Sequence, residues 1–419
     1  MRAPLLLAAA GALSIAAIPA RATTLDDAIA AAMRHAPSLA QAQAGVREAD
    51  GALLQAHAQA LPQMAAQASI AAGRLDPGGF FGLQATNTTP RMAEVSIEQP
   101  IFAGGRVKAG IEAARAGGRA ARAQQAAAKA NLAAAVAKAY SDVIVAEMEV
   151  VRYERLAAEM TEIERQAGLR FKSGEMPSTD YAQARARQAG AEAGLAQARG
   201  DLLTAHAHYR TLVGADPVDL APLPPPPATP AEIDTAVNIA LEANPDLAAA
   251  KAAEDQAAAA ARAARAGRLP TIGAFAEAST VRDQFFPGYR GDQVAAGVRA
   301  RWTFFDAGRT AGAIQQADAK RDAAGAGVQA ARDAVIEGAT AAFQQLVTAR
   351  RVAAASDLQS QAAAEALRGA KLEAKVGAKP QLAVLDAERD ALAADLQAAA
   401  ARGDILVAAY RLRALLGEF

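Results

Sequence analysis

The chain has 419 residues, no cysteine, and 44 acidic side chains that balance 44 lysines and arginines. Apolar residues make up 52% of it but aromatic residues only 4%, because about 120 residues are alanine. Alanine favours helix and buries little area per residue, which argues against one large conventional core. The zero net charge argues against nucleic acid as a main partner, and the lack of cysteine excludes disulfides, thiol catalysis and an N-terminal lipidated cysteine.

Residues 1–22 have the pattern of a cleavable signal peptide. Arg2 is followed by an apolar run over residues 5–18 and by Ala20-Arg21-Ala22, a small-x-small cleavage site. The run is shorter than the roughly 20 apolar residues of a membrane span, so an uncleaved anchor is the weaker alternative. We therefore expect an exported protein, whose mature chain carries a net charge of −2 once Arg2 and Arg21 are removed.

The next segment, residues 23–220, predicts a helix, two strands and two further helices. Thr24 is a suitable N-cap for an alanine-rich helix that runs to about residue 60, with a break near Pro37. Alternating polar and apolar residues then predict strands over 63–74 and 91–102, separated by a loop rich in Gly, Pro, Asn and Thr.

A glycine turn leads from the second strand into a long helix, Arg106–Lys172, which would be roughly 100 Å long at about 1.5 Å per residue. Gly174 ends this helix, and Pro177 opens a shorter helix that returns over about 179–213. A proline-rich linker, residues 221–230, follows as a stiff polyproline spacer.

Residues 231–419 repeat the same order of elements: a helix at about 232–268, strands at 271–282 and 293–304, a long helix at 309–375, and a return helix at about 381–416. Matching motifs carry the repeat. Leu61-Pro62 matches Leu269-Pro270 at an offset of 208, and Gly174-x-x-Pro177 matches Gly377-x-x-Pro380 at an offset of 203. The offset changes once, between residues 62 and 102, so the chain is a duplication whose copies differ by five residues in a loop.

The four predicted strands have about 12 residues each, enough to cross a bilayer when tilted. No later segment is apolar and uncharged over a spanning length, so a mature chain that crosses a membrane must do so as a closed barrel. Four strands cannot close one, because the smallest membrane barrels have eight. Three chains would supply twelve; the alternative is a pair of soluble amphipathic hairpins.

The helices carry alanine on several faces, which allows close packing on more than one side and favours a cylindrical wall over a soluble coiled coil. The return helix at about 179–213 and the helix at about 232–268 together approach the length of one long helix, so they could stack end to end and match it. The expected fold class is mixed α and β, mainly α: a long antiparallel α-helical barrel continued by a 12-stranded trimeric transmembrane β-barrel, four strands per chain.

Aromatic residues stand at the predicted ends of the strands. The two equivalent loops contain Phe80, Phe81, Phe285 and Phe286, and Trp302 stands at the opposite strand end. We interpret the loop residues as an aromatic belt at the outer membrane interface, with packing between loops as the alternative. Trp302 suits the inner interface or a buried strand–helix junction.

Together, the duplicated halves, two strands per half, long helices and Gly-x-x-Pro tips resemble the TolC-like outer-membrane efflux proteins over nearly the whole mature chain. The resemblance implies a homotrimeric exit duct of a tripartite efflux or type I secretion system in the cell outer membrane, extending into the periplasm. It also implies a periplasmic adaptor protein and an inner-membrane pump of RND or ABC type as partners, with outer-membrane lipid around the barrel.

The resemblance assigns a periplasmic gate to the tips of the helices. The residues that it places there are Gly174, Pro177, Thr179, Asp180, Gly377, Lys379, Pro380 and Asp386. Lys379 stands where the TolC protein itself has a pairing arginine, and Asp386 matches one of its two pore-facing aspartates. Ala383 replaces the other aspartate and Ala374 replaces a tyrosine of the closing network, so the constriction and lock differ from that pattern.

Two other classes of function are alternatives to a passive duct. A periplasmic helical-hairpin adaptor would share the helices but would stay soluble without detergent. An enzyme is not indicated, because the sequence has no Gly-x-Ser-x-Gly, His-Glu-x-x-His or Walker-type loop, and no cofactor is expected.

Overall fold

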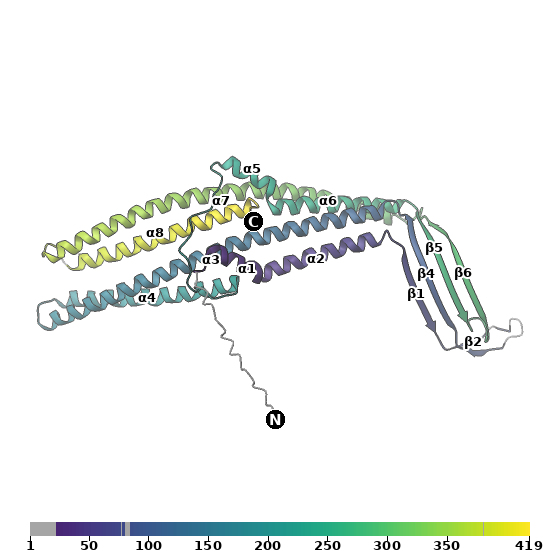
Figure 1. The fold of residues 1–419 in the computed structure, drawn as a ribbon, viewed down its shortest axis with the longest axis horizontal. Coiled ribbons are helices and arrows are strands. Elements are labelled where there is room, and N and C mark those ends of the chain that lie inside the picture. The colour runs from purple at the N-terminus through teal and green to yellow at the C-terminus, as the bar shows by residue number, and fades with distance from the viewer. Residues whose placement is uncertain (1–21, 77, 80–83, 380) are drawn as a thin grey trace, which may run out of the picture.

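The computed structural model describes residues 22–76, 78–79, 84–379 and 381–419. It is an elongated bundle of helices with a sheet that bends away at one end (Figure 1). The helices are α1 Leu25–His35, α2 Pro37–Ala58, α3 Arg106–Lys172, α4 Ser178–Val213, α5 Ile233–Ala243, α6 Pro245–Arg265, α7 Arg309–Lys375 and α8 Gln381–Leu415, with a short 3₁₀ turn η2 Ala266–Arg268. The strands are β1 Gln63–Ile70, β2 Gly73–Leu75, β3 Thr86–Thr88, β4 Arg91–Phe102, β5 Thr271–Arg282 and β6 Arg290–Arg301.

The two long helices, α3 and α7, have the bounds that the sequence predicts and 67 residues each. On α3, the shorter helices α2 and α4 pack along successive lengths, and α6 and α8 do the same on α7 (Figure 1). The shorter helices of each half therefore follow one another along the long helix of that half. Helices α6 and α8 also pack on α3, which joins the two halves side by side.

Three predicted elements have different bounds. The helix expected at 232–268 breaks at Asn244, because Pro245 begins a new helix and Asn244 caps it by accepting hydrogen bonds from the N–H groups of Asp246 and Leu247. The strand expected at 63–74 ends at Ile70, and the next residues form β2, which pairs with β3.

The last strand begins and ends three residues earlier than predicted, at Arg290 rather than Gln293 and at Arg301 rather than Phe304. Its ladder stops where Arg301 pairs with Thr271, the residue after Pro270. Proline has no N–H to donate, so β5 offers no continuing ladder beyond that pair.

The main sheet is antiparallel with strand order β1-β4-β5-β6, so that β4 and β5 are neighbours although helices α3 to α6 separate them in the sequence. Its register aligns Ala66, Val95, Ala278 and Val294 in one cross-strand row, and the neighbouring row contains Gln67, Glu94, Ser279 and Gln293. Because side chains alternate along a strand, these two rows lie on opposite faces. One face is therefore mainly apolar and exposed, and the other carries carboxylates, amides and arginines.

The passage from strand to helix depends on glycine. Gly105 and Gly308 precede α3 and α7 with φ of 86° and 93°, a left-handed conformation that glycine adopts at least cost. At Gly104, also left-handed, a Cβ atom would lie 2.8 Å from the carbonyl oxygen of Ala266. In the second half, Asp306 accepts hydrogen bonds from the hydroxyl of Thr310 and from the N–H groups of Thr310 and Gly308, which lowers the pKa of its carboxyl group.

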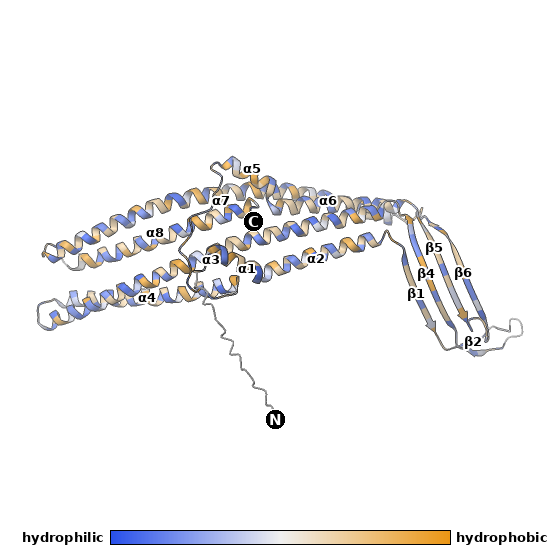
Figure 2. Ribbon diagram, in the orientation of Figure 1, coloured by the Kyte–Doolittle hydropathy of each residue, from blue (hydrophilic) through white to orange (hydrophobic). Residues whose placement is uncertain are grey.

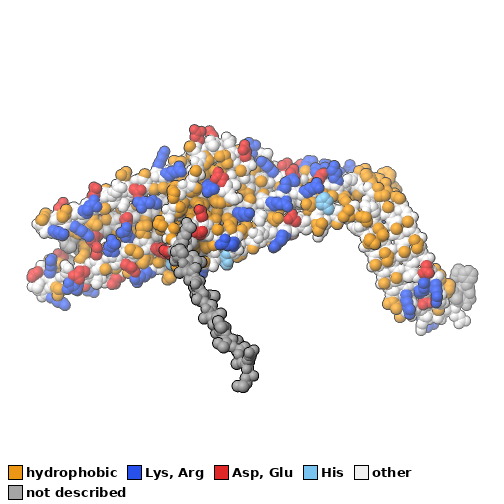
Figure 3. Space-filling model, viewed as in Figure 1, with side chains coloured by type: hydrophobic (Ala, Val, Ile, Leu, Met, Phe, Trp, Pro, Cys, Tyr) orange, Lys and Arg blue, Asp and Glu red, His pale blue; other side chains and the backbone are white. Residues whose placement is uncertain are grey.

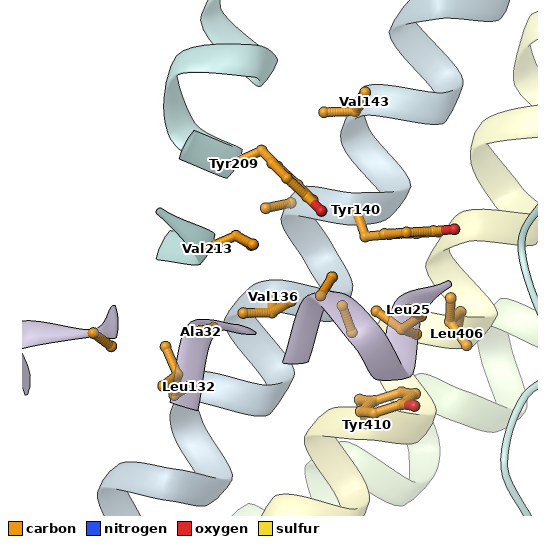
Figure 4. Packing of buried hydrophobic residues seen from close by; sticks show 14 of the residues in the cluster. Leu25, Ala32, Leu132, Val136, Tyr140, Val143, Tyr209, Val213, Leu406 and Tyr410 are labelled. Atoms are coloured by element: carbon orange, nitrogen blue, oxygen red, sulfur yellow. The ribbon is translucent and has the colours of Figure 1, made fainter. Parts of the chain in front are cut away.

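The best-packed core lies midway along the helices, where α1 contacts α3 and α4. Tyr140 and Tyr209 are almost fully buried there among side chains of α1, α3, α4 and α8 (Figure 4). The Tyr140 hydroxyl lies 2.9 Å from the carbonyl oxygen of Thr23 and 2.6 Å from that of Ala221, and burial raises its pKa to about 12. This tyrosine therefore ties the start of the first half to the linker.

In the second half, Phe343 and Leu346 of α7 and Leu412 of α8 belong to a second buried core against α5 and α6. Away from these two cores many of the buried residues are alanine, and apolar and polar residues alternate along the helices (Figure 2). Within the described ranges, none of the helices has the length and apolar character needed to cross a membrane.

Candidate functional site

The helical ends farthest from the sheet form two hairpin tips (Figure 1). In the first, Gly174 has φ of 78°, its N–H donates to the carbonyl oxygen of Phe171, and the N–H of Glu175 donates to that of Arg170. Pro177 is the N-cap of α4. The glycine closes α3 and the proline starts α4, which is the turn that the sequence pattern predicts.

Thr179 and Asp180 lie in the first turn of α4 and are exposed. The Thr179 hydroxyl is 3.5 Å from Asp180 Oδ1. An aspartate in this place is favoured by the helix dipole. Beside it, Tyr181 stacks on Phe171 and donates a hydrogen bond to Glu164, so that α4 is fastened to α3 at the tip.

The second tip has the same backbone turn. Gly377 has φ of 74°, its N–H donates to Ala374 and the N–H of Ala378 donates to Glu373. Lys379 forms an ion pair of 2.9 Å with Glu373 of the same hairpin. Pro380 lies outside the described residues.

Asp386 makes one of the contacts that join the two hairpins. Its Oδ1 is 2.8 Å from an Nη atom of Arg187 on α4, and the two side chains are 46% and 28% exposed. A charged pair thus connects α8 to α4 close to the tips. Neither Arg187 nor Glu373 was a candidate from sequence, because arginines and glutamates occur on many faces of these helices.

A second charged group lies one step farther from the tips, between α3, α7 and α8. Lys371 is 2.6 Å from Glu388, which is only 8% exposed, and Glu159 of α3 faces the same carboxylate. Burial, followed by the negative charge of Glu388, raises the pKa of Glu159. The ion pair with Glu388 in turn raises the pKa of Lys371. Sequence reasoning missed this group, since it is assembled from three helices.

Beside both charged groups lies a small apolar cluster of Ala157, Met160, Ala191 and Leu385. The tip is therefore held by a few discrete contacts between hairpins rather than by a continuous core. Such an arrangement can separate or close without unfolding the helices.

The aromatic residues of the sheet lie at its two ends. Phe285 and Phe286, in the turn between β5 and β6, are exposed and both make edge contacts with Tyr289. Phe80 and Phe81 lie outside the described residues. Trp302 is 61% exposed and donates a hydrogen bond to the carbonyl oxygen of Arg268 at the helix end of the sheet.

The model of a family described as outer membrane efflux protein matches residues 28–215 and 236–418. Outer membrane efflux protein BepC of Brucella suis biovar 1 (strain 1330) is 31% identical over 392 residues, which cover 93% of this chain and 84% of that protein.

Solved structures share the fold. The CmeC outer membrane channel of Campylobacter jejuni superposes with a TM-score of 0.83 at 16% identity, over 94% of this chain and 85% of that one. A membrane protein from Pseudomonas aeruginosa has a TM-score of 0.81 at 21% identity, over 94% and 93% of the two chains. The open state of the MtrE outer membrane channel of Neisseria gonorrhoeae has a TM-score of 0.75 at 24% identity, over 94% and 88%.

Proposed function

Because this chain belongs to the outer membrane efflux protein family, and is thus an outer-membrane efflux channel that extends into the periplasm, we propose that three copies assemble into one continuous exit duct. The adaptor alternative is thereby wrong, and the family is one of channels rather than enzymes. In the duct, twelve strands form the membrane barrel and the helices form the periplasmic wall. The two duplicated units, 23–220 and 231–419, each supply two strands and one hairpin tip.

The four-stranded sheet is the observation that carries the proposal. Its strand order leaves β1 and β6, as far as the described residues go, with one neighbouring strand each. Large apolar side chains on one face are open to the surroundings, including Met64 at 72%, Val294 at 86% and Val298 at 67% exposure. Open edges and an exposed apolar face are costly in water, and both are satisfied when strands of several chains close a barrel in lipid.

The partners follow from this architecture. We propose that a periplasmic adaptor protein binds the helical tips and that an inner-membrane pump, of RND or ABC type, supplies the energy. The duct itself would be passive, exporting small molecules or polypeptides, and would open when partner binding favours separated tips. The Arg187–Asp386 contact between hairpins would favour the closed tips, and Lys379–Glu373, with Asp180 at the start of α4, would hold the turns of the tips in shape.

Membrane extraction followed by sizing in detergent tests the assembly. We expect the protein in the outer-membrane fraction, a detergent-solubilised trimer near three times the chain mass, and ion conductance in planar bilayers. A monomer recovered in the aqueous fraction would contradict the proposal.

A further inference from the structure

We propose that a row of arginines at the outer end of the sheet binds the phosphate groups of outer-leaflet glycolipid headgroups. The row consists of Arg91, Arg282 and Arg290, which are direct cross-strand partners on β4, β5 and β6. The proposal rests on the proposed barrel, in which the apolar face of the sheet points to lipid.

The register places the three arginines on that apolar face. Counting by two along β4 leads from Arg91 through Ala93 and Val95 to Ile97, and along β6 from Arg290 through Asp292 to Val294. The arginines are therefore the last row of the surface that faces lipid. They are not part of the polar face, which carries Arg299 and Arg301.

The row stands at the height of the headgroups. From Ile272 to Arg282, β5 rises about 34 Å along its axis, and a tilt of about 40° reduces this to a height of about 26 Å, close to the apolar band of roughly 25 Å in outer-membrane barrels. The helices leave the other end of the sheet, so this row lies at the outer boundary. Lysine and arginine side chains gather visibly at this loop end of the strands (Figure 3).

On the described strands, the arginines of the row outnumber the carboxylates of the same face. Like charges in directly opposed positions destabilise a sheet. On the four strands, this face supplies one carboxylate, Asp292, whose Oδ1 is 2.9 Å from Arg282 and also accepts a hydrogen bond from Thr280. In the flanking loops lie Arg74, Asp76 and Asp283; the Asp283 carboxylate accepts from the N–H of Gly288 and the Asp76 carboxylate from that of Gly78. Two guanidinium groups, those of Arg91 and Arg290, thus remain in excess on the face.

Arginine suits the proposed ligand. Its planar guanidinium binds phosphate through two parallel hydrogen bonds, and neighbouring strands about 4.8 Å apart set the three groups within reach of one headgroup. Neutralisation by phosphate would also remove the repulsion within the row. The same face is apolar directly below, as acyl chains attached to that headgroup require.

The test uses the purified full-length protein in detergent, titrated with diphosphorylated lipid A and with its dephosphorylated form, with bound lipid counted by native mass spectrometry. We expect the wild type to prefer the phosphorylated form by at least about tenfold, as charge-assisted hydrogen bonds to two phosphates would provide. The double variant R91Q/R290Q should lose this preference. The matched variant R299Q/R301Q removes two arginines from the other face of the same sheet and should keep it.

Each other outcome overturns the proposal. Equal binding of the two lipids by the wild type needs no variant and rejects phosphate recognition, even if R91Q/R290Q fails to fold. Equal losses in both double variants would indicate general attraction by positive charge. Displacement of lipid A by millimolar inorganic phosphate would indicate a site for the free anion. Trimer mass and conductance are recorded for the same samples: a conducting trimer without lipid preference rejects this inference alone, whereas a monomer rejects the proposed function and this inference with it.

Discussion

At the scale of single residues, the ion pairs at the tips differ in what they connect. Lys379 and Glu373 belong to the same hairpin, so their contact holds a turn in shape. Arg187 and Asp386 belong to different hairpins, so theirs resists separation of α4 from α8. A partly exposed pair contributes about 0.5 kcal/mol, and three copies in a trimer would together bias closure by about 1.5 kcal/mol.

Substitution R187A, or D386A, is therefore expected to increase the open probability of the channel about tenfold in planar bilayers. The control is R199A, which breaks the Arg199–Glu154 pair between α4 and α3 of one hairpin and should leave opening unchanged. If R199A opens the channel as much as R187A does, the contact between hairpins is not what holds the tips closed.

Glu159 makes the stability of the folded protein depend on pH, and the sign of that dependence follows from its raised pKa. Because burial raises its pKa in the folded protein above the ordinary value of 4.5, the stability associated with its protonated form is present below pH 4.5 and is lost as the pH rises through the raised pKa. We expect E159Q to raise the thermal unfolding temperature at pH 7 and to flatten its dependence on pH above 4.5.

Glu162, three residues along the same helix, provides a control of opposite sign. Hydrogen bonds from Arg165 and Gln166 lower the pKa of its exposed carboxyl group to about 2. Its contribution to stability is therefore present above pH 4.5 and is lost as the pH falls toward 2. E162Q should therefore leave the pH profile above 4.5 unchanged. A flattened profile in E162Q as well would mean that Glu159 is not its source.

At the scale of elements, most of the architecture could be predicted from local signals. The bounds of α3, α7, β4 and β5 follow from turn glycines and from alternation over 12 residues. The break before Pro245 was missed, although the aligned Pro37 marks the same break in the first half. The end of β6 was misplaced because Trp302 and Phe304 continue the alternation after the partner strand has ended.

The contacts of the tip were less predictable than its turns. A repeated Gly-x-x-Pro spacing marks the turns at Gly174 and Gly377. Arg187 meets Asp386 only once two hairpins lie side by side, and Glu159, Lys371 and Glu388 come from three helices. With alanine on every face, helical periodicity does not reveal which charged side chains face one another.

The strand–helix junction provides a prediction at this scale. G104A should destabilise the protein by about 2–4 kcal/mol, because its φ is +61° and the new methyl group would lie 2.8 Å from Ala266 O and 2.9 Å from Leu269 Cβ. The control G110A lies inside α3 with open space around it and should cause no loss. Thermal unfolding followed by circular dichroism compares the two; equal melting temperatures would show that the junction tolerates a side chain.

At the scale of the whole molecule, the two sheet edges would determine how copies meet in the proposed trimer. Because the four strands are antiparallel in the order β1-β4-β5-β6, β6 of one copy and β1 of the next would run in opposite directions, and the ladder could continue across chains. Three such joins close a ring without leaving an edge.

The chain has no cysteine, so cross-linking can test these joins directly. We expect Ala65→Cys on β1, combined in turn with a cysteine at Gln293, Ala295 or Gly297 on β6, to yield covalent trimers for the pair in register. Within one chain these strands are about 14 Å apart, too far for a disulfide. Ser96→Cys on the interior strand β4, in place of Ala65→Cys, should form none; trimers from that control, or none from the full set, would contradict closure between β1 and β6.

The equal length of α3 and α7 also restricts how this molecule can change. Each helix begins at the sheet and ends at a tip, and each has 67 residues. Inserting a single residue in one of them would shift its tip by about 1.5 Å and rotate it by about 100° relative to the other. To change the distance from the sheet to the tips, matched insertions would be needed in both long helices and in the shorter helices beside them. The duplicated design thus makes the distance from membrane to tip a nearly fixed dimension, to which any partner across the periplasm has to adjust.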